Sequence, residues 1–421
     1  MNKQFWFLTI TVFVVLLIPS LVQEGMFLDG ITYSAISNNL ANGIGSIWCP
    51  SYTKTMYISF YEHPPLVFII QSWFFKIFGS AFYTERIYSF FIALMTLIGI
   101  VKCWRLFFSR ENDWLPILLW LFVPLISWAY KNNILENTMG VFTIFSIFFI
   151  TKSLIKKRIL YLFLGSSLIV LAFLSKGFVG IFPIIVPIIY AIVYKNDKIT
   201  ILYFGYSIFL ITASIIVSLY VFPELNKNLI HYFNQQLFPA LNNQREITTN
   251  NRFSILLNLI SELLLPIIIL LLFAIKDWKK QKINSLIQYK VALFWFLIAI
   301  SASIPLVLTL KQRTFYTLPS IPFYILSIST LLNPYINSIK EKITPKKSRL
   351  IKNSSIFVLS CAILYSILKY GDYSRDKEMI KDIYLISKVI PKGTIMKTSN
   401  ELCEQWSLIA YLVPLRKLTT Y

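Results

Sequence analysis

Residues 159–178 read ILYLFLGSSLIVLAFLSKGF. The apolar run 159–174 is close to the length of a helix that crosses a bilayer, and a second such run follows at 178–194. Only Ser175, Lys176 and Gly177 separate the two runs. The stretch therefore predicts two antiparallel membrane helices joined by a tight turn that carries a lysine.

The composition of the whole chain extends this prediction. Of 421 residues, 56% are hydrophobic and only 14% are charged, and the mean hydropathy is +0.65. Soluble domains are about 25% charged, so these values exclude a water-soluble enzyme and a disordered chain. The net charge of +21 would suggest a nucleic-acid partner in a soluble chain. Here the lysines cluster in short segments between apolar runs, which is the pattern of cytoplasmic loops in membrane proteins. We therefore do not expect a nucleic-acid partner.

Apolar runs that could each cross a membrane occur along most of the chain. They are 5–22, 86–108, 114–130, 139–151, 159–174, 178–194, 199–222, 253–275, 291–310, 315–333 and 353–369. We therefore expect an all-α polytopic membrane protein with about eleven transmembrane helices. The short apolar stretch 64–79 is predicted to lie at the outer interface, because a crossing there would move every later basic loop to the other side.

This arrangement predicts two domains with defined sides. Residues 1–369 form a transmembrane domain with a cytoplasmic N-terminus, and residues 370–421 form a small extracytoplasmic C-terminal domain. The outer loops 23–85 and 223–252 are long, which is typical of functional loops, and the first should hold interfacial helices. Cys49 and Cys403 share the outer side and are the only pair that could form a disulfide, although their spacing does not require one.

Three carboxylates fall at the ends of apolar segments on the outer side. Asp29 follows the first segment, Glu62 lies in Tyr-Glu-His-Pro-Pro, and Glu136 precedes the run at 139–151. Carboxylates at a membrane face are costly unless they are solvated or used. Each also has a structural interpretation: Asp29 as the N-cap of a helix beginning near Gly30, Glu62 in a salt bridge with a neighbour, and Glu136 paired with Lys131.

Cationic side chains on the same side could bind an anion. Lys176 opposes the charge bias of outer turns, and Arg245 and Arg252 lie in the second long loop. His63, beside Glu62, is either a surface histidine or a phosphate contact. Glu262 lies inside an apolar run and must face the bundle interior, with a partner that the sequence does not identify.

Several of these motifs resemble one known family. They are the acidic residue after the first helix, the Tyr-Glu-His-Pro-Pro-Leu block at 61–66, Lys-Ile-Phe-Gly at 76–79, Glu-Arg-Ile at 85–87, Glu-Asn at 136–137, Leu-Ser-Lys-Gly at 174–177 and Arg-Thr-Phe-Tyr-Thr-Leu-Pro at 313–319. Together they are similar to the GT-C class of glycosyltransferases that use polyprenyl-phosphate sugars. The branch they resemble contains the protein O-mannosyltransferases and the lipid A aminoarabinose transferases, and the likeness spans roughly residues 5 to 330.

The resemblance implies an inverting transferase in a bacterial inner membrane, with its active site facing the periplasm. Its donor is a sugar on a polyprenyl-phosphate carrier, and its acceptor is a lipid, a glycan or a protein. The catalytic carboxylates would be Asp29 as the base or acceptor-orienting group, Glu62 as an acceptor or sugar contact, and Glu136 as the second acid of the site. The donor phosphate would be held by Lys176, His63 and Arg245 or Arg252, and Tyr316 would line the donor cavity.

Two features qualify this expectation. The aminoarabinose branch has Lys where this chain has His63, which argues against aminoarabinose as the sugar. We expect no resident cofactor and see no metal motif, although a divalent cation is possible. Two alternatives remain: a transporter or lipid flippase, which predicts charges at mid-membrane and inverted repeats, and a lipid-carrier polymerase or ligase of surface polysaccharide.

Overall fold

The computed structural model describes residues 3–53, 57–195, 197–277, 286–391, 394–396, 402, 405–416 and 419–420. Its membrane-length helices are α1 (Lys3–Leu21), α4 (Thr84–Trp104), α7 (Leu135–Lys156), α8 (Ile159–Lys176), α10 (Asp197–Val221), α15 (Leu286–Ser303), α16 (Ile321–Glu341) and α17 (Pro345–Leu368). Short 3₁₀ turns extend two of these, η3 (Ile304–Leu308) after α15 and η4 (Thr314–Ser320) before α16. Eight helices of the described chain are long and apolar enough to cross a membrane.

Three further apolar regions are interrupted. Helices α13 (Ser254–Glu262) and α14 (Leu264–Asp277) form a pair bent by 60° that would make a ninth span. The run 114–130 divides into α5 (Leu115–Leu121) and α6 (Pro124–Lys131), and the run 178–194 into η1 (Phe178–Ile185) and α9 (Val186–Tyr194). Proline inside or at the start of these pieces explains the breaks, because it cannot donate to the helical ladder. The polytopic all-α fold is thus confirmed, while the count of eleven crossings stays a prediction.

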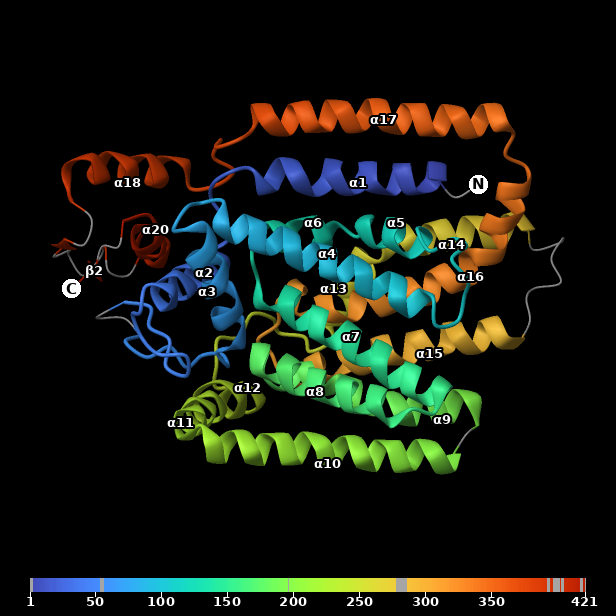
Figure 1. The fold of residues 1–421 in the computed structure, drawn as a ribbon, viewed down its shortest axis with the longest axis horizontal. Helices are drawn as coiled ribbons and strands as arrows, with labels where there is room; N and C mark the ends of the chain where they lie inside the picture. Colours follow the sequence, from blue (N-terminus) through green and yellow to red (C-terminus); the bar gives the residue numbers. More distant parts are fainter. Residues whose placement is uncertain are drawn as a thin grey trace.

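The two long predicted outer loops contain helices of their own. The first holds α2 (Leu28–Ala41) and α3 (Leu66–Phe78), and the second holds α11 (Pro223–Tyr232), the π-helical turn η2 (Phe233–Leu237) and α12 (Phe238–Leu241). The C-terminal segment contains α18 (Lys377–Val389), α20 (Trp406–Arg416) and two paired two-residue strands, β1 (Ile395–Met396) and β2 (Thr419–Thr420). Figure 1 shows all three segments at one end of the helix bundle.

The C-terminal segment is joined to the start of the first loop. The backbones of Glu24 and Tyr373 pair in an isolated parallel β-bridge, and the nitrogen of Gly371 donates to the Val22 carbonyl at 3.0 Å. The hydroxyl of Tyr411 on α20 accepts a hydrogen bond from the Met26 nitrogen at 3.1 Å. The chain that leads into α2 is therefore held by residues 349 and 385 positions later in the sequence. Division of the chain at residue 369 stays a prediction, and Cys403 lies outside the described residues.

Candidate active site

A cavity of about 710 Å³ opens between the bundle and the second loop. One end of its wall is polar, with two carboxylates, Glu62 and Glu136, and three cations, Lys176, Arg245 and Lys311. The rest of the wall is mostly apolar and comes from η1, from the turn 232–241 and from residues 301–309. Of the residues predicted from the sequence, His63 and Tyr316 also line it, whereas Asp29 and Arg252 do not.

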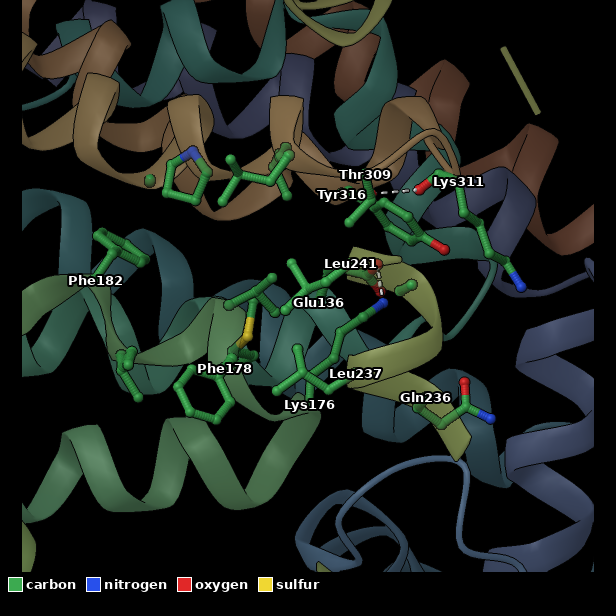
Figure 2. Close-up of a pocket in the computed structure, with 18 of the residues that line it drawn as sticks. Glu136, Lys176, Phe178, Phe182, Gln236, Leu237, Leu241, Thr309, Lys311 and Tyr316 are labelled. Carbon is green, nitrogen blue, oxygen red and sulfur yellow. Dashed lines mark hydrogen bonds and ion pairs between the residues drawn. The ribbon is translucent and has the colours of Figure 1, made fainter. Parts of the chain in front are cut away.

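A buried ion pair occupies the polar end of the cavity. The Lys176 ammonium contacts Oε1 of Glu136, and the two side chains are 11% and 1% exposed. The same ammonium lies over the Tyr316 ring, 4.7 Å from its centroid. Figure 2 shows the lysine directed at Glu136, with Tyr316 and Lys311 near the same polar end. The sequence-based pairing of Glu136 with Lys131 is therefore wrong, because α7 and α8 bring Lys176 to the start of α7.

The turn after Lys176 explains why this lysine is held so firmly. Gly177 ends α8 with φ 90° and ψ −147°, a backbone conformation that residues with a Cβ rarely adopt. A Cβ at Gly177 would lie 2.0 Å from the Tyr232 hydroxyl, which donates to the Lys176 carbonyl at 3.5 Å. The glycine thus lets the second loop close against the lysine turn.

Asp29 lies in the first turn of α2 and is half-buried. The helix begins two residues earlier than a cap at Asp29 requires, and its N-cap residue, Phe27, makes no side-chain capping bond. The N-cap interpretation of Asp29 is therefore wrong. Burial raises the pKa of Asp29 above its ordinary value, and the positive charges of Lys176, Lys311 and Arg313 oppose this rise. The carboxylate is thus within electrostatic reach of the cavity cations without being part of the wall.

Two neighbouring asparagines hold the start of α2 against the start of α7. The Phe27 nitrogen donates to Oδ1 of Asn132 at 2.8 Å, and Nδ2 of Asn133 donates to the Gly30 carbonyl at 3.1 Å. A Cβ at Gly30 would lie 1.9 Å from the Asn132 carbonyl oxygen, so the contact requires glycine. This clamp places Asp29 beside the helix that carries Glu136.

Arg86, in the first turn of α4, also connects the segment before α2 with the segment before α7. Its guanidinium donates to the Gly25 carbonyl at 2.6 Å and to the Lys131 carbonyl. The side chain is only 3% exposed. A planar guanidinium with several donors suits two carbonyls at once, which a lysine could not satisfy in the same way. The Glu-Arg-Ile motif at 85–87 therefore has a positioning role in the structure.

Glu62 and His63 form the wall of the cavity on the side of the first loop. Oε1 of Glu62 accepts a hydrogen bond from the Tyr57 hydroxyl at 3.1 Å. The Tyr33 hydroxyl lies 3.3 Å from Nε2 of His63, and the two rings are nearly perpendicular. Burial raises the pKa of Tyr33 well above its ordinary value, and Asp29, Glu136 and Glu62 raise it further. Tyr33 is thus close to all three predicted carboxylates.

Of the remaining cations, Lys311 and Arg245 line the cavity, whereas Arg252 does not. Lys311 is 3.8 Å from the Glu246 carboxylate, and burial together with Arg245 lowers the pKa of this lysine. Among the described residues, no hydrogen bond or ion pair holds the Arg245 guanidinium, which is free to contact a ligand. Arg252 is exposed and donates to the Leu308 carbonyl, so in this structure it supports the segment before Lys311.

Tyr33 and Lys311 are site residues that the sequence interpretation missed. Tyr33 follows Asp29 by four positions on α2, a spacing that places both on one helix face. That spacing is the signal that could have found it. Lys311 follows η3 in a short connection, where Gln312 donates to the Arg252 and Thr309 carbonyls at 2.6 and 3.0 Å. No local pattern marks such a long-range contact.

Two other expectations concern residues away from the cavity. Glu262 accepts a hydrogen bond from the Leu125 nitrogen at 2.8 Å, which identifies its partner as the backbone at the start of α6. In the part of the chain that the structure describes, no group of three or more His, Cys, Asp or Glu is arranged to hold a metal ion.

Comparison with known proteins gives an independent view of this fold and site. Residues 62–220, which hold Glu62, Glu136 and Lys176, match the family model described as dolichyl-phosphate-mannose-protein mannosyltransferase. No curated protein matches the sequence.

Solved structures resemble the whole chain. ArnT from Cupriavidus metallidurans bound to undecaprenyl phosphate has a TM-score of 0.59 at 14% identity, covering 99% of this chain and 75% of that chain. Its apo state gives 0.54 at 13% identity, with 96% and 73% covered. The archaeal oligosaccharyltransferase AglB from Archaeoglobus fulgidus, in complex with an inhibitory peptide and a dolichol-phosphate, gives 0.52 at 14% identity, with 96% and 60% covered.

The fold and the family match agree with the resemblance that the motifs carry. The chain has a multi-pass membrane fold similar to those of the GT-C glycosyltransferases ArnT and AglB, and a mannosyltransferase family model matches its residues 62–220.

Proposed function

We propose that the protein transfers a sugar from a polyprenyl-phosphate carrier to a lipid, glycan or protein acceptor at the periplasmic face of a bacterial inner membrane, with inversion at the sugar. The observation that carries this proposal is that the cavity has a charged end and a mostly apolar remainder. Its polar end holds Lys176, Arg245 and Lys311 beside Glu62 and Glu136, while its walls at 178–185 and 301–309 are mostly apolar. A polyprenyl phosphate has the same two parts, an anionic head and an apolar chain.

The cations supply what a sugar-phosphate donor needs. As the glycosidic bond breaks, the carrier phosphate takes the bonding electrons and gains negative charge, which nearby cations stabilise. Arg245 and Lys311 are the cations best placed for this, because Lys176 is already paired with Glu136. Lys176 then acts as a bridge between the carboxylate and the phosphate end of the cavity.

A carboxylate must accept the proton of the attacking acceptor group. Asp29 is the candidate for this role because Asn132 and Asn133 hold the start of α2 beside the helix that carries Glu136, just outside the cavity wall. Burial also raises its pKa, which makes its ionised form a stronger base than an exposed aspartate. Glu62 lines the cavity and can orient the acceptor or the sugar. The path of the proton is from the acceptor hydroxyl or amine to the Asp29 carboxylate as the new glycosidic bond forms.

Reconstitution tests this proposal. The purified full-length protein in lipid nanodiscs would receive radiolabelled undecaprenyl-phosphate sugars together with an envelope extract as the acceptor source. We expect label to move to an extract component, and mass spectrometry of envelope lipids and proteins from a deletion strain to show the loss of the same product. A protein that neither binds undecaprenyl phosphate nor transfers any label from it would contradict the proposal.

A further inference from the structure

Three aromatic rings form a connected surface beside the Lys176–Glu136 pair. The Trp128 ring packs on Phe315 with centroids 5.6 Å apart at an interplanar angle of 22°, and Phe27 contacts these two rings at 5.4 and 6.0 Å. The Lys176 ammonium lies 5.6 Å from the Phe315 ring centroid. None of the three rings belongs to the wall of the cavity. They therefore form a second surface that reaches the same ion pair.

The accessible part of this aromatic surface lies close to Asp29. Phe315 is buried, whereas Phe27 and Trp128 are half-buried. Phe27 precedes Asp29 by two positions, and its nitrogen donates to Oδ1 of Asn132 at 2.8 Å. The C–H faces of a sugar ring are apolar and pack on aromatic rings, while its hydroxyls stay available for other partners. The surface thus suits a saccharide that presents a hydroxyl to the proposed base.

Two cations flank the aromatic surface. The Arg375 guanidinium lies over Phe27, 5.8 Å from its ring centroid. Lys131 is the last residue of α6 and follows Trp128 by three positions, a spacing that places both side chains on one helix face. The side chains of Arg375 and Lys131 therefore border the two accessible rings.

Backbone contacts at Gly25 hold these two cations in place. The Gly25 carbonyl accepts from the Arg86 guanidinium at 2.6 Å and from the Ser374 hydroxyl at 2.8 Å, and Arg86 also donates to the Lys131 carbonyl. A Cβ at Gly25 would lie 2.4 Å from the Arg375 carbonyl oxygen, so this close approach requires glycine. The C-terminal segment thereby contributes Arg375 to a surface built by the first outer loop and α6.

The charges of Lys131 and Arg375 are poorly compensated. In the described part of the chain, Arg375 forms an ion pair with its neighbour Asp376 at 3.5 Å, and no ion pair or hydrogen bond holds the Lys131 ammonium. Burial, together with the positive charges of Arg86 and Arg375, lowers the pKa of Lys131. Like charges within electrostatic reach of one another are unfavourable, and an anion beside them relieves the repulsion.

We propose that this surface binds the acceptor and that the acceptor is an acidic glycan. One sugar ring packs on Phe27 and Trp128, and its phosphate or carboxylate group is held by Lys131 and Arg375. The inference rests on the proposed function, because it assigns the second substrate of the same reaction.

The acidic group of the glycan is bound but not glycosylated. The new bond forms between a neutral hydroxyl oxygen of the glycan and the anomeric carbon of the donor sugar. The bond from that carbon to the carrier phosphate breaks with its electrons on the phosphate, and the hydroxyl proton passes to Asp29.

Kinetics with separate variation of the two substrates test the surface. The full-length protein in nanodiscs would receive radiolabelled undecaprenyl-phosphate sugar, with serial dilutions of envelope extract as the acceptor source. We expect Lys131→Gln and Arg375→Gln each to raise the apparent acceptor KM about tenfold, as the loss of a contact to a charged group implies, and to change the donor KM less than about threefold. Lys377→Gln is the matched control, because this exposed lysine follows Arg375 by two positions and should leave both values unchanged. Thermal unfolding identifies any variant whose stability is lost.

The chemical nature of the product tests the acceptor class. We expect the labelled product to be retained on an anion-exchange column and to survive proteinase digestion. A neutral product, or one that proteinase degrades, would overturn the inference. So would an unchanged acceptor KM in both variants, or an increase confined to the donor KM, which would place the two cations at the donor instead. Wild type that transfers no label from the carrier would contradict the proposed function itself.

Discussion

Lys176 and Glu136 form an ion pair across the ends of two membrane helices, with the lysine at the last position of α8 and the glutamate in the first turn of α7. Both side chains are largely removed from solvent, so neither charge is tolerated alone. The pair also links the phosphate end of the cavity to the carboxylate end. Its removal should therefore affect stability and binding in separable ways.

Glu136→Gln should destabilise the protein because it leaves the Lys176 charge buried without a partner. Breaking a buried ion pair from one side costs about 3–5 kcal/mol, whereas replacing both partners with apolar residues is often close to neutral. We expect thermal unfolding in detergent to show a lower midpoint for Glu136→Gln and substantial recovery in the double variant Glu136→Leu with Lys176→Met. Transfer should be lost in both. Recovery of transfer in the double variant would contradict a role for the pair in the site.

Asp29→Asn should abolish transfer and leave binding of undecaprenyl phosphate intact. General-base catalysis contributes about 10²- to 10⁴-fold, and the amide cannot accept the proton. Because burial raises the pKa of Asp29, the ionised and active form is lost as pH falls through a value above the ordinary range of aspartate. We therefore expect kcat/KM to decrease toward acid pH, with the acid limb lying above the ordinary pKa of an aspartate. Retained transfer in Asp29→Asn would remove this residue from the mechanism.

Gly177→Ala should destabilise the lysine turn and weaken donor binding. The positive φ of 90° and the Tyr232 hydroxyl 2.0 Å from the new Cβ are both unfavourable for alanine. Such backbone strain costs about 1–3 kcal/mol, and the displaced Tyr232 would no longer hold the second loop. Gly140→Ala is the matched control, because its Cβ meets no atom within 4 Å. Equal unfolding midpoints and equal KM values for the two variants would show that the turn tolerates a side chain.

Much of the fold could be predicted from the sequence because bilayer length constrains apolar runs. The tight connection between the apolar segments 159–174 and 178–194 is predictable, since three residues leave no room for a longer loop; in the structure α8 runs on to Lys176, and Gly177 alone separates it from η1. The breaks inside 114–130 and 178–194 were missed. Pro124 and Pro183 signal them in the sequence, but composition over a long window averages such residues away.

The candidate site was predictable only where local spacing carries information. Glu136 and Lys176 were both identified from segment ends, yet their pairing depends on how α7 packs against α8. The start of α2 at Leu28 rather than after Asp29 depends on Asn132 and Asn133, which hold the backbone from a distant loop. Such tertiary contacts override the capping preference of aspartate, which is worth only about 1 kcal/mol.

Lys311 and Arg313 provide a test of which cation binds the donor. Both contact Glu246, at 3.8 and 3.3 Å, and they are two positions apart in the same connection, but only Lys311 lines the cavity. Lys311→Ala should therefore raise the KM for the lipid-linked sugar about tenfold or more, because a charge-assisted contact to phosphate contributes about 1.5–3 kcal/mol. Arg313→Ala should change it less than about threefold, because exposed ion pairs contribute up to about 1 kcal/mol. Both variants lie in the same connection and lose a contact with the same partner, Glu246. A difference in KM between them therefore reports whether the side chain reaches the cavity. Equal increases in KM for both variants would mean that Glu246 and its loop, rather than the Lys311 ammonium, control donor binding.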